Sequence, residues 1–211
     1  MATLHEVASY YDEYTQDYLQ VSDVVQIGRF SDDDDEHVRI LGQRAALEDG
    51  QRVLDCGCGV GGVMARLARE MPASVFHGVT ISPEQLRLAR ERLADLPHCE
   101  VRLEDFQQLS SADASYDALL YRETLGYADL EASLREALRV VRPGGTVYFK
   151  ECFAQEGPLS PAQQEELDQY VASWMYQART PSTVAALARQ LGFDLVWVEP
   201  RFTDVLVPLV A

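Results

Sequence analysis

Short apolar runs alternate with segments of helical periodicity through the middle of the chain. The apolar runs predict five strands, at 52–55, 74–79, 99–103, 116–121 and 146–151. The segments between them predict helices at 61–70, 83–96 and 130–141. Strands and helices that alternate in this way indicate an α/β fold, in which helices cover both faces of a parallel sheet.

The last third of the chain breaks this alternation. Two helices are expected there, from Ser160-Pro161 to about 177 and from Thr180-Pro181 to Gly192. Strands are expected next, at 193–198 and 202–210. Only residues 199–201 separate them, and so short a link cannot hold a crossover helix, so these two strands must be antiparallel. The predicted sheet therefore has seven strands and is mostly parallel, with one antiparallel strand.

The beginning of the chain is predicted to be helical. In a helix at 4–21, Tyr11, Tyr14 and Tyr18 lie on one face, which either packs on the domain or closes over a pocket as a lid. The acidic run 32–36 precedes a second helix, at 36–48, which Gly50 ends. Because the run has no EF-hand pattern, we expect it to cap this helix and to bind no metal.

Composition limits the class of protein. The chain has 211 residues, 47% hydrophobic and 25% charged, enough for one domain with a sizeable core. We divide it into an N-terminal helical lid, 1–48, and a core, 49–211. No apolar run reaches the ~18 residues of a membrane helix, and residues 1–6 do not resemble a secretion signal, so we expect a cytoplasmic protein. The formal net charge of −16 argues against a nucleic acid or an anionic membrane as partner.

The four cysteines do not have the spacing of a metal site. They stand at 56, 58, 99 and 152, without the paired spacing that zinc requires. Two of them fall in the glycine-rich stretch 55–61. We therefore expect small, buried, free thiols in a reducing compartment.

The glycine-rich stretch after the first strand is the strongest candidate site. Asp55 ends the strand, Gly57, Gly59 and Gly61 alternate after it, and a helix follows. A dinucleotide fingerprint would be Gly-x-Gly-x-x-Gly, so the spacing argues against an NAD-dependent dehydrogenase. An anion prefers bare amides at a helix N-terminus, whereas a carboxylate at the strand end suits a cationic amino group.

This stretch resembles motif I of the class I S-adenosylmethionine-dependent methyltransferases, and the resemblance covers roughly residues 50–200. It implies a Rossmann-like, seven-stranded sheet with one antiparallel strand, S-adenosylmethionine as cofactor and S-adenosylhomocysteine as product. Asp55 and the backbone of Gly57 and Gly59 would face the amino acid part of the cofactor. The turn from Cys58 to Gly61 would pass beneath it.

The end of the second strand departs from the most common pattern of this family. Most relatives have an acid there that holds the ribose, but this chain has Thr80. The segment 78–85 is similar to that of tocopherol-type and cyclopropane-fatty-acid-type methyltransferases, which implies that Thr80 and Gln85 contact the ribose and Ile81 packs on adenine. The alternative is a plain strand-to-helix turn in which Ser82 caps the helix.

The ends of the third and fourth strands complete the implied site. The resemblance implies that Asp105, or alternatively Glu104, accepts the adenine amino group and that the amide of Phe106 meets a ring nitrogen. The segment 121–127 is similar to the "Glu-Ser-x-x-His" segment of small-molecule methyltransferases. We include Arg122, at the end of the fourth strand, among the cofactor-binding residues. Glu123 matches that segment, and Tyr127 stands where many relatives have His.

Methyl transfer from a sulfonium needs alignment of donor and acceptor, and an oxygen or carbon acceptor also loses a proton. Glu123 and Tyr127 are the candidate catalytic residues, with His5 or His37 as alternatives if the N-terminal segment closes over the site. Aromatic side chains suit an apolar or planar acceptor, and we expect these to wall its pocket: Tyr11, Tyr14, Tyr18 and Trp174.

The sequence thus predicts a methyltransferase that acts on an O, N or C atom of a small molecule, in secondary metabolism. One alternative is the same fold and cofactor in a non-methylating reaction such as a cyclisation. A second alternative is a non-catalytic binding module. A homodimer is left open.

Overall fold

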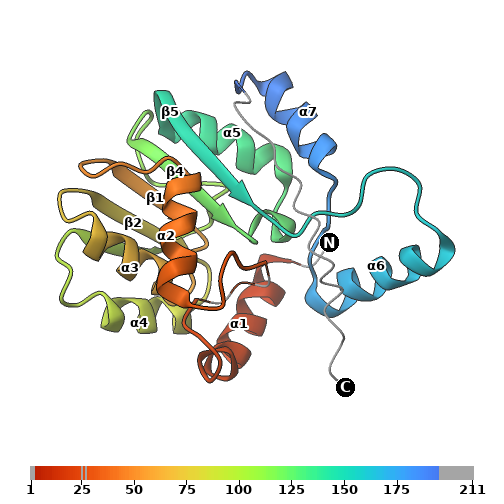
Figure 1. Ribbon diagram of the computed structural model, residues 1–211, viewed down its shortest axis with the longest axis horizontal. Helices are drawn as coiled ribbons and strands as arrows, with labels where there is room; N and C mark the ends of the chain where they lie inside the picture. Colours follow the sequence, from red (N-terminus) through yellow and green to blue (C-terminus); the bar gives the residue numbers. More distant parts are fainter. Residues whose placement is uncertain (1–2, 25, 27, 195–211) are drawn as a thin grey trace.

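A five-stranded parallel sheet forms the centre of the molecule. The computed structural model describes residues 3–24, 26 and 28–194, and Figure 1 shows the sheet flanked by helices. The strands are β1 (Arg52–Cys56), β2 (Val75–Thr80), β3 (Cys99–Leu103), β4 (Tyr116–Arg122) and β5 (Val141–Lys150). Their order is β3-β2-β1-β4-β5, and every neighbouring pair is parallel. The predicted α/β fold is confirmed for these strands.

Helices cover both faces of this sheet. The helices are α1 (Leu4–Leu19), α2 (Asp34–Arg44), α3 (Gly62–Glu70), α4 (Pro83–Arg92), α5 (Leu130–Val140), α6 (Pro161–Trp174) and α7 (Pro181–Leu191), with a 3-10 turn, η1 (Leu125–Tyr127). Buried side chains of α2, α3 and α4 pack on one face, and those of α5 and α7 on the other. In Figure 1, α1 and α6 lie beyond the end of the sheet toward which the β5 arrow points.

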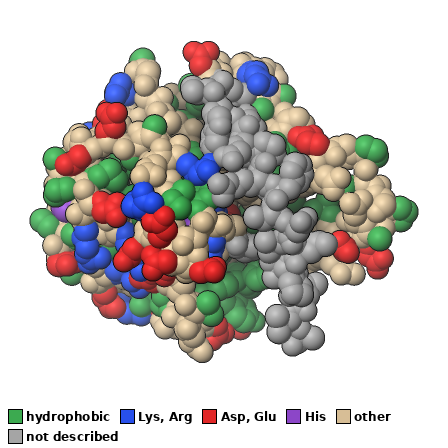
Figure 2. Space-filling view, viewed as in Figure 1, with side chains coloured by type: hydrophobic (Ala, Val, Ile, Leu, Met, Phe, Trp, Pro, Cys, Tyr) green, Lys and Arg blue, Asp and Glu red, His purple; other side chains and the backbone are tan. Residues whose placement is uncertain are grey.

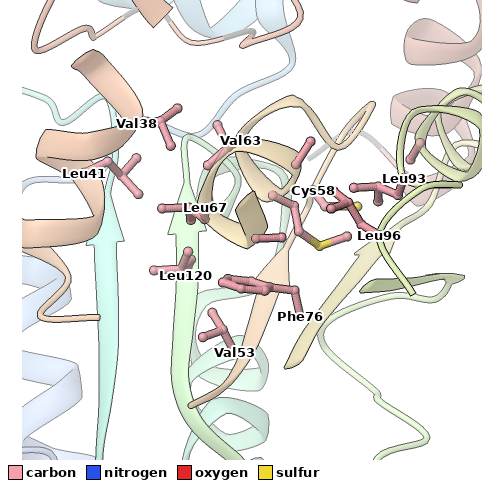
Figure 3. Close-up of a cluster of buried hydrophobic side chains, with 14 of the residues drawn as sticks. Val38, Leu41, Val53, Cys58, Val63, Leu67, Phe76, Leu93, Leu96 and Leu120 are labelled. Atoms are coloured by element: carbon pink, nitrogen blue, oxygen red, sulfur yellow. The ribbon is translucent and has the colours of Figure 1, made fainter. Parts of the chain in front are cut away.

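Alternate residues of each strand enter the two halves of the core, because successive side chains of a strand point to opposite faces. In β1, Val53 packs with α2 and α3 while Leu54 packs with α5. Figure 3 shows Phe76 of β2 and Leu120 of β4 on the same side as Val53, facing Leu67 of α3. Each such fully buried side chain stabilises the fold by about 1.5–3 kcal/mol.

The acidic run after α1 caps α2, as predicted. The Asp33 carboxylate accepts a hydrogen bond from the amide of Glu36, which satisfies one of the free N–H groups of the first turn. Asp34 pairs with Arg29 (2.5 Å) and Asp35 with Arg66 (2.7 Å). These carboxylates therefore tie the start of α2 to the segment before it and to α3. Figure 2 shows acidic and basic side chains interspersed on the visible face.

Three helices end three or more residues earlier than the sequence predicts. α2 ends at Arg44 rather than 48, and Ala46 then adopts a left-handed φ of 51°. α4 ends at Arg92 rather than 96. α6 ends at Trp174 rather than 177, because the left-handed φ of Met175, 55°, does not continue a helix.

The fifth strand is longer than expected, and the predicted strands beyond it fall largely outside the described part. β5 begins at Val141, so the segment 142–145, which lies between the helix predicted at 130–141 and the strand predicted at 146–151, belongs to the strand. The predicted strands 193–198 and 202–210 lie outside the described residues, apart from 193 and 194. The antiparallel strand, and with it the seven-stranded sheet, stays a prediction. Within the described residues, no helix is long and apolar enough to cross a membrane.

Candidate active site

A cavity of about 740 Å³ lies at the carboxyl ends of the strands, where sheets of this kind bind ligands. It joins the glycine-rich turn after β1 to a group of aromatic side chains from α1, η1 and the α6 region. Most residues of the predicted site line it: Tyr11, Tyr18, Gly57, Cys58, Gly59, Thr80, Ile81, Gln85, Asp105, Phe106, Arg122, Glu123, Tyr127 and Trp174. Three residues of the predicted site do not line it, namely Tyr14, Asp55 and Gly61.

The turn after β1 has the shape that its glycines allow. Gly57, Gly59 and Gly61 all have positive φ, at 83°, 55° and 76°. The amides of Gly57 and Cys58 donate to the carbonyl of Val79, which ties the turn to β2. A Cβ on Gly59 would meet nothing within 4 Å, so the turn leaves open space above its middle glycine. Gly61 instead faces α4, where it allows close packing on Ala89.

The two cysteines near this turn are buried and free, as predicted. Burial raises the pKa of the Cys58 thiol well above its ordinary value, and it does the same for Cys56. Both side chains therefore stay protonated near neutral pH. They pack as small apolar groups rather than serve as nucleophiles.

Asp55 contributes to the site indirectly. Its buried carboxylate accepts hydrogen bonds from Arg122, with Nη2–Oδ2 at 2.7 Å and Nε–Oδ1 at 3.3 Å. The side chains are only 5% and 2% exposed, for Arg122 and Asp55. In this conformation the Asp55 carboxylate is therefore occupied by Arg122 and is not exposed to the amino group of a cofactor. Instead, the Arg122 guanidinium lines the cavity with its charge already balanced.

The end of β2 has features of both interpretations of the sequence, a pair of polar residues for the ribose and a strand-to-helix turn capped by Ser82. Thr80 Oγ1 donates to Gln85 Oε1 at 2.8 Å, so the two residues expected to hold the ribose are in contact. The Ser82 hydroxyl accepts from the Gln85 amide and caps α4. The strand-to-helix turn is thus well capped, and it also brings two polar side chains to the cavity wall beside Ile81.

The acids after β3 already have partners inside the protein. Asp105 accepts from the amide of Gln107 (2.9 Å) and from its side chain (3.0 Å). Glu104 accepts from the Ser110 hydroxyl (2.6 Å). Both acids line the cavity, so the choice between them for adenine stays open. The ring of Phe106, next in the chain, packs edge-on against Tyr121.

Glu123 has a left-handed φ of 60° and bridges two segments. Its Oε1 accepts from the Lys150 ammonium (2.5 Å) and from the amide of Gly28 (2.9 Å). Lys150 is the only lysine in the chain. The carboxylate is thus engaged by a cation and an N–H group, which suits a role in holding the segment before α2 over the sheet.

Tyrosines form an aromatic wall on the far side of the cavity. The hydroxyl of Tyr11, on α1, donates to that of Tyr127 at 3.0 Å. The ring of Tyr127 packs edge-on against Tyr176, with centroids 5.1 Å apart, and Tyr176 in turn against Tyr170 (6.1 Å). Burial raises the pKa of Tyr127 well above its ordinary value, so its phenol stays neutral and is a poor general base.

The remaining predicted substrate and base candidates are placed less centrally. Tyr14 is 40% exposed and packs on Tyr10 instead of facing the cavity. His37 is fully buried in α2, where its Nδ1 accepts from the amide of Phe30 and Nε2 pairs with Gln26. His5 lies exposed on α1. Neither histidine lines the cavity.

Sequence reasoning missed two residues that organise the site. Thr124 donates its hydroxyl to the carbonyl of Cys56, and its methyl group fills the space that a Cβ on Gly57 would need, 2.4 Å away. Glu151, just after β5, accepts hydrogen bonds from two amides of the turn at 124–128 and from Tyr176. The only sequence signal for Glu151 is a carboxylate at the carboxyl end of a parallel strand.

Several known proteins with similar sequences are methyltransferases. Residues 53–145 match a family model described as a methyltransferase domain. The chain is 28% identical to O-methyltransferase rstn1 of Aspergillus nomiae, over 96% of this chain and 93% of that protein. It is also 28% identical to phosphoethanolamine N-methyltransferase 2 of Caenorhabditis elegans. That match covers 82% of this chain but only 40% of the worm protein.

Solved structures share the fold. The [4+2]-cyclase SpnF superposes with a TM-score of 0.75 at 24% identity, covering 90% of this chain and 73% of that one. Phosphoethanolamine N-methyltransferase 2 of Haemonchus contortus, solved with S-adenosyl-L-methionine, gives 0.76 at 22% identity, over 92% of this chain and 45% of that one. Residues 53–145 therefore form a methyltransferase domain of the S-adenosylmethionine-dependent kind, for which S-adenosylmethionine is the cofactor and S-adenosylhomocysteine the product.

Proposed function

We propose that the protein transfers a methyl group from S-adenosylmethionine to an O, N or C atom of a small molecule of natural-product type. One observation carries this proposal: a single cavity joins the open glycine turn to the aromatic wall of Tyr11, Tyr127 and Tyr176. A cofactor bound at the glycine turn and a planar acceptor bound at the aromatic wall would therefore lie next to each other in this cavity.

The residues at the turn suit the cofactor. The open space above Gly59 accommodates an extended ligand against the backbone. Thr80 and Gln85 supply a hydroxyl and an amide for ribose hydroxyl groups, and Ile81 an apolar surface for adenine. When bound, S-adenosylmethionine supplies an activated methyl group on a sulfonium, whose departure needs no proton from the protein.

The protein's own part in the reaction is positioning and exclusion of water. The N-terminal segment, residues 1–48, is proposed to act as the lid. In it α1 is fastened to α4 where Asp12 accepts from the Ser82 hydroxyl (2.5 Å) and the Glu84 amide (3.1 Å). Its Tyr11 then closes against Tyr127. Alignment of this kind contributes up to roughly 7–11 kcal/mol in the best intramolecular cases.

A phosphorylated acceptor fits this cavity poorly. Each arginine that lines it in the described part of the chain pairs with a carboxylate: Arg29 with Asp34, Arg66 with Asp23 and Arg122 with Asp55. A phosphate would therefore have to displace an internal partner. An uncharged aromatic or polyketide-like acceptor suits the tyrosine wall better.

Turnover with an acceptor panel tests the proposal. The protein is incubated with S-adenosylmethionine and phenols, amines or prenyl compounds, and S-adenosylhomocysteine is quantified. We expect one class to yield methylated product and equal S-adenosylhomocysteine. Gly59→Val should abolish this, because the new side chain enters the cavity. Gly157→Val is the matched control, since Gly157 also has positive φ and open space but does not line the cavity.

The likeness to the cyclase SpnF favours one second candidate, a non-methylating reaction that uses the same cofactor site. In that case product forms while no S-adenosylhomocysteine accumulates. Binding of S-adenosylhomocysteine without turnover of any compound would favour a non-catalytic module.

A further inference from the structure

Glu151 lies at the junction of three segments that are distant in the sequence. It follows directly after β5. Its Oε1 accepts hydrogen bonds from the amides of Thr124 (3.1 Å) and Leu125 (3.3 Å), at the start of the turn after β4. Its Oε2 accepts from the hydroxyl of Tyr176. One carboxylate therefore joins the end of β5, the turn at 124–128 and the segment 175–179.

The turn that Glu151 holds touches both halves of the cavity. Thr124 donates to the Cys56 carbonyl at 3.0 Å and packs against Gly57, so it contacts the glycine turn. Tyr127, at the other end of the turn, packs edge-on against Tyr176 at the aromatic wall. A displacement of this turn would change the distance between the two halves.

Other contacts hold the same segments together without Glu151. The amide of Gln177 donates to the carbonyl of Gly126 (2.8 Å), and Arg179 donates to the carbonyls of Leu125 and Ala128 (2.7 Å each). The absence of a Cβ on Gly126 leaves room for the Tyr176 ring. Removal of the carboxylate should therefore loosen the turn and the ring without unfolding the region.

We propose that Glu151 is a positioning residue for methyl transfer: by fixing the turn at 124–128 to the Tyr176 ring, it sets where the acceptor lies relative to the glycine turn. The acceptor part of this inference rests on the proposed function. The structural part of the inference does not rest on it, because it concerns only how firmly Glu151 holds the turn at 124–128 and the segment 175–179 together.

The surroundings of Glu151 predict a pH dependence. Burial, with a smaller contribution from the nearby Glu123, raises its pKa to about 7, against the hydrogen bonds from Tyr176 and the two amides. Among the described residues, the other titratable groups near it include Arg179, Tyr121, Tyr176 and Cys152, and burial keeps both phenols and the thiol neutral. Because the carboxyl group returns to water when the segments open, ionisation of the buried group makes opening easier as the pH rises toward 7.

Two variants separate these effects. Glu151→Gln keeps an acceptor for the amides and mimics the protonated form, and Glu151→Ala removes all three bonds. Glu136→Ala is the matched control, because that carboxylate also accepts a loop amide, from Leu109 (2.6 Å), and neither residue lines the cavity. Hydrogen–deuterium exchange is measured for peptides covering 122–129 and 170–179, with S-adenosylhomocysteine bound, from pH 6 to 8.

We expect at least tenfold faster exchange of both peptides in Glu151→Ala and less than a twofold change in the control. In the wild type, exchange corrected for its intrinsic pH dependence should rise as the pH increases toward about 7 and then level off, and Glu151→Gln should lack this step. The inference is overturned if Glu151→Ala exchanges like the wild type. If that variant fails to fold, the same pH step in Glu151→Gln and wild type overturns it.

Kinetics test the acceptor part. With the best acceptor of the panel, Glu151→Ala should lower kcat/KM for the acceptor at least tenfold, while the KM for S-adenosylmethionine changes less than threefold. Glu151→Gln should restore most of the activity at pH 8 and lose the pH step. Equal losses for both substrates would overturn positioning of the acceptor. Failure of every acceptor would remove the proposed function, and the exchange experiment would still decide the role of Glu151.

Discussion

The carboxylate of Asp55 and the guanidinium of Arg122 form a buried ion pair between the carboxyl ends of β1 and β4, with Nη2 2.7 Å from Oδ2. In the β1–β4 register, Asp55 lies opposite Leu120, two residues before Arg122. The two charged residues are therefore neighbours at the same end of adjacent strands. The pair fixes the start of the glycine turn. It also balances a cation that would otherwise face the cavity alone.

Asp55→Ala should cost about 3–5 kcal/mol of the free energy of unfolding, because it leaves the Arg122 charge buried without a partner. Urea unfolding measures this loss, and calorimetry with S-adenosylhomocysteine should show that affinity is lost as well. The double variant Asp55→Ala/Arg122→Met should regain stability but not affinity if the carboxylate also serves the cofactor. Wild-type stability and affinity in Asp55→Ala would contradict the role of the pair.

Gly57→Ala should weaken both folding and cofactor binding. The new Cβ would lie 2.4 Å from Cγ2 of Thr124, and the φ of 83° is unfavourable for alanine. Gly50→Ala reports the backbone cost alone, about 1–2 kcal/mol, because φ there is 94° and nothing lies within 4 Å.

Removal of the Thr124 methyl group separates the two costs of Gly57→Ala, namely the steric clash with Thr124 and the backbone strain at positive φ. Gly57→Ala combined with Thr124→Ser should recover the steric part of the loss, because serine keeps the hydroxyl that donates to Cys56. Thermal unfolding of the single and double variants measures this. If Thr124→Ser brings no recovery, the contact with Thr124 does not explain the requirement for glycine.

Tyr127→Phe should retain most of the activity. Burial raises the pKa of Tyr127 well above its ordinary value, so the phenol is not expected to accept a proton near neutral pH. The variant loses one hydrogen bond, from Tyr11, worth about 0.5–1.5 kcal/mol, or roughly a twofold to tenfold change in kcat/KM. Tyr127→Ala, which also removes the ring contacts, should cost more. A loss of a thousandfold or more in Tyr127→Phe would make the hydroxyl catalytic.

The sequence predicts the sheet and the glycine turn well because both rest on local signals. Apolar runs and helical periodicity locate each strand, and alternating glycines mark the turn. The sequence does not predict which groups pair with the buried carboxylates, because the partners are distant in the chain. Arg122 is 67 residues from Asp55, and Tyr176 is 25 from Glu151, so only the folded sheet brings them together.

Tyr14 shows the limit of helical periodicity. A residue turns by about 100° along a helix, so Tyr18 lies within about 20° of Tyr11, while Tyr14 lies about 60° away. The cavity-facing side of α1 accordingly contains Val7, Tyr11 and Tyr18, and Tyr14 is 40% exposed. Helical periodicity predicts correctly which side of α1 faces the cavity. It does not predict how far around the helix the contact extends, because that depends on where the turn at 124–128 lies.

His37 should make stability depend on pH below neutrality. Burial, and then the cations Lys150 and Arg29, lower its pKa to about 4. Its Nδ1 accepts from the amide of Phe30, an arrangement that requires a ring without a proton on that nitrogen. The unfolded chain binds a proton near the ordinary pKa of 6.5, so the stabilisation is complete above 6.5 and is lost as the pH falls toward 4.

The loss should amount to up to about 3 kcal/mol in the free energy of unfolding, because the pKa of His37 is about 4 in the folded protein and 6.5 in the unfolded chain. Glu151 acts in the opposite sense, because its raised pKa makes its contribution complete below about 4.5 and lost as the pH rises to about 7. The effect of His37 is therefore measured as the difference between wild type and His37→Gln in urea unfolding at pH 5 and pH 7.5. His5→Gln, on the exposed side of α1, is the control. A wild-type advantage over His37→Gln that is the same at both pH values would show that the ring is not held neutral by its surroundings.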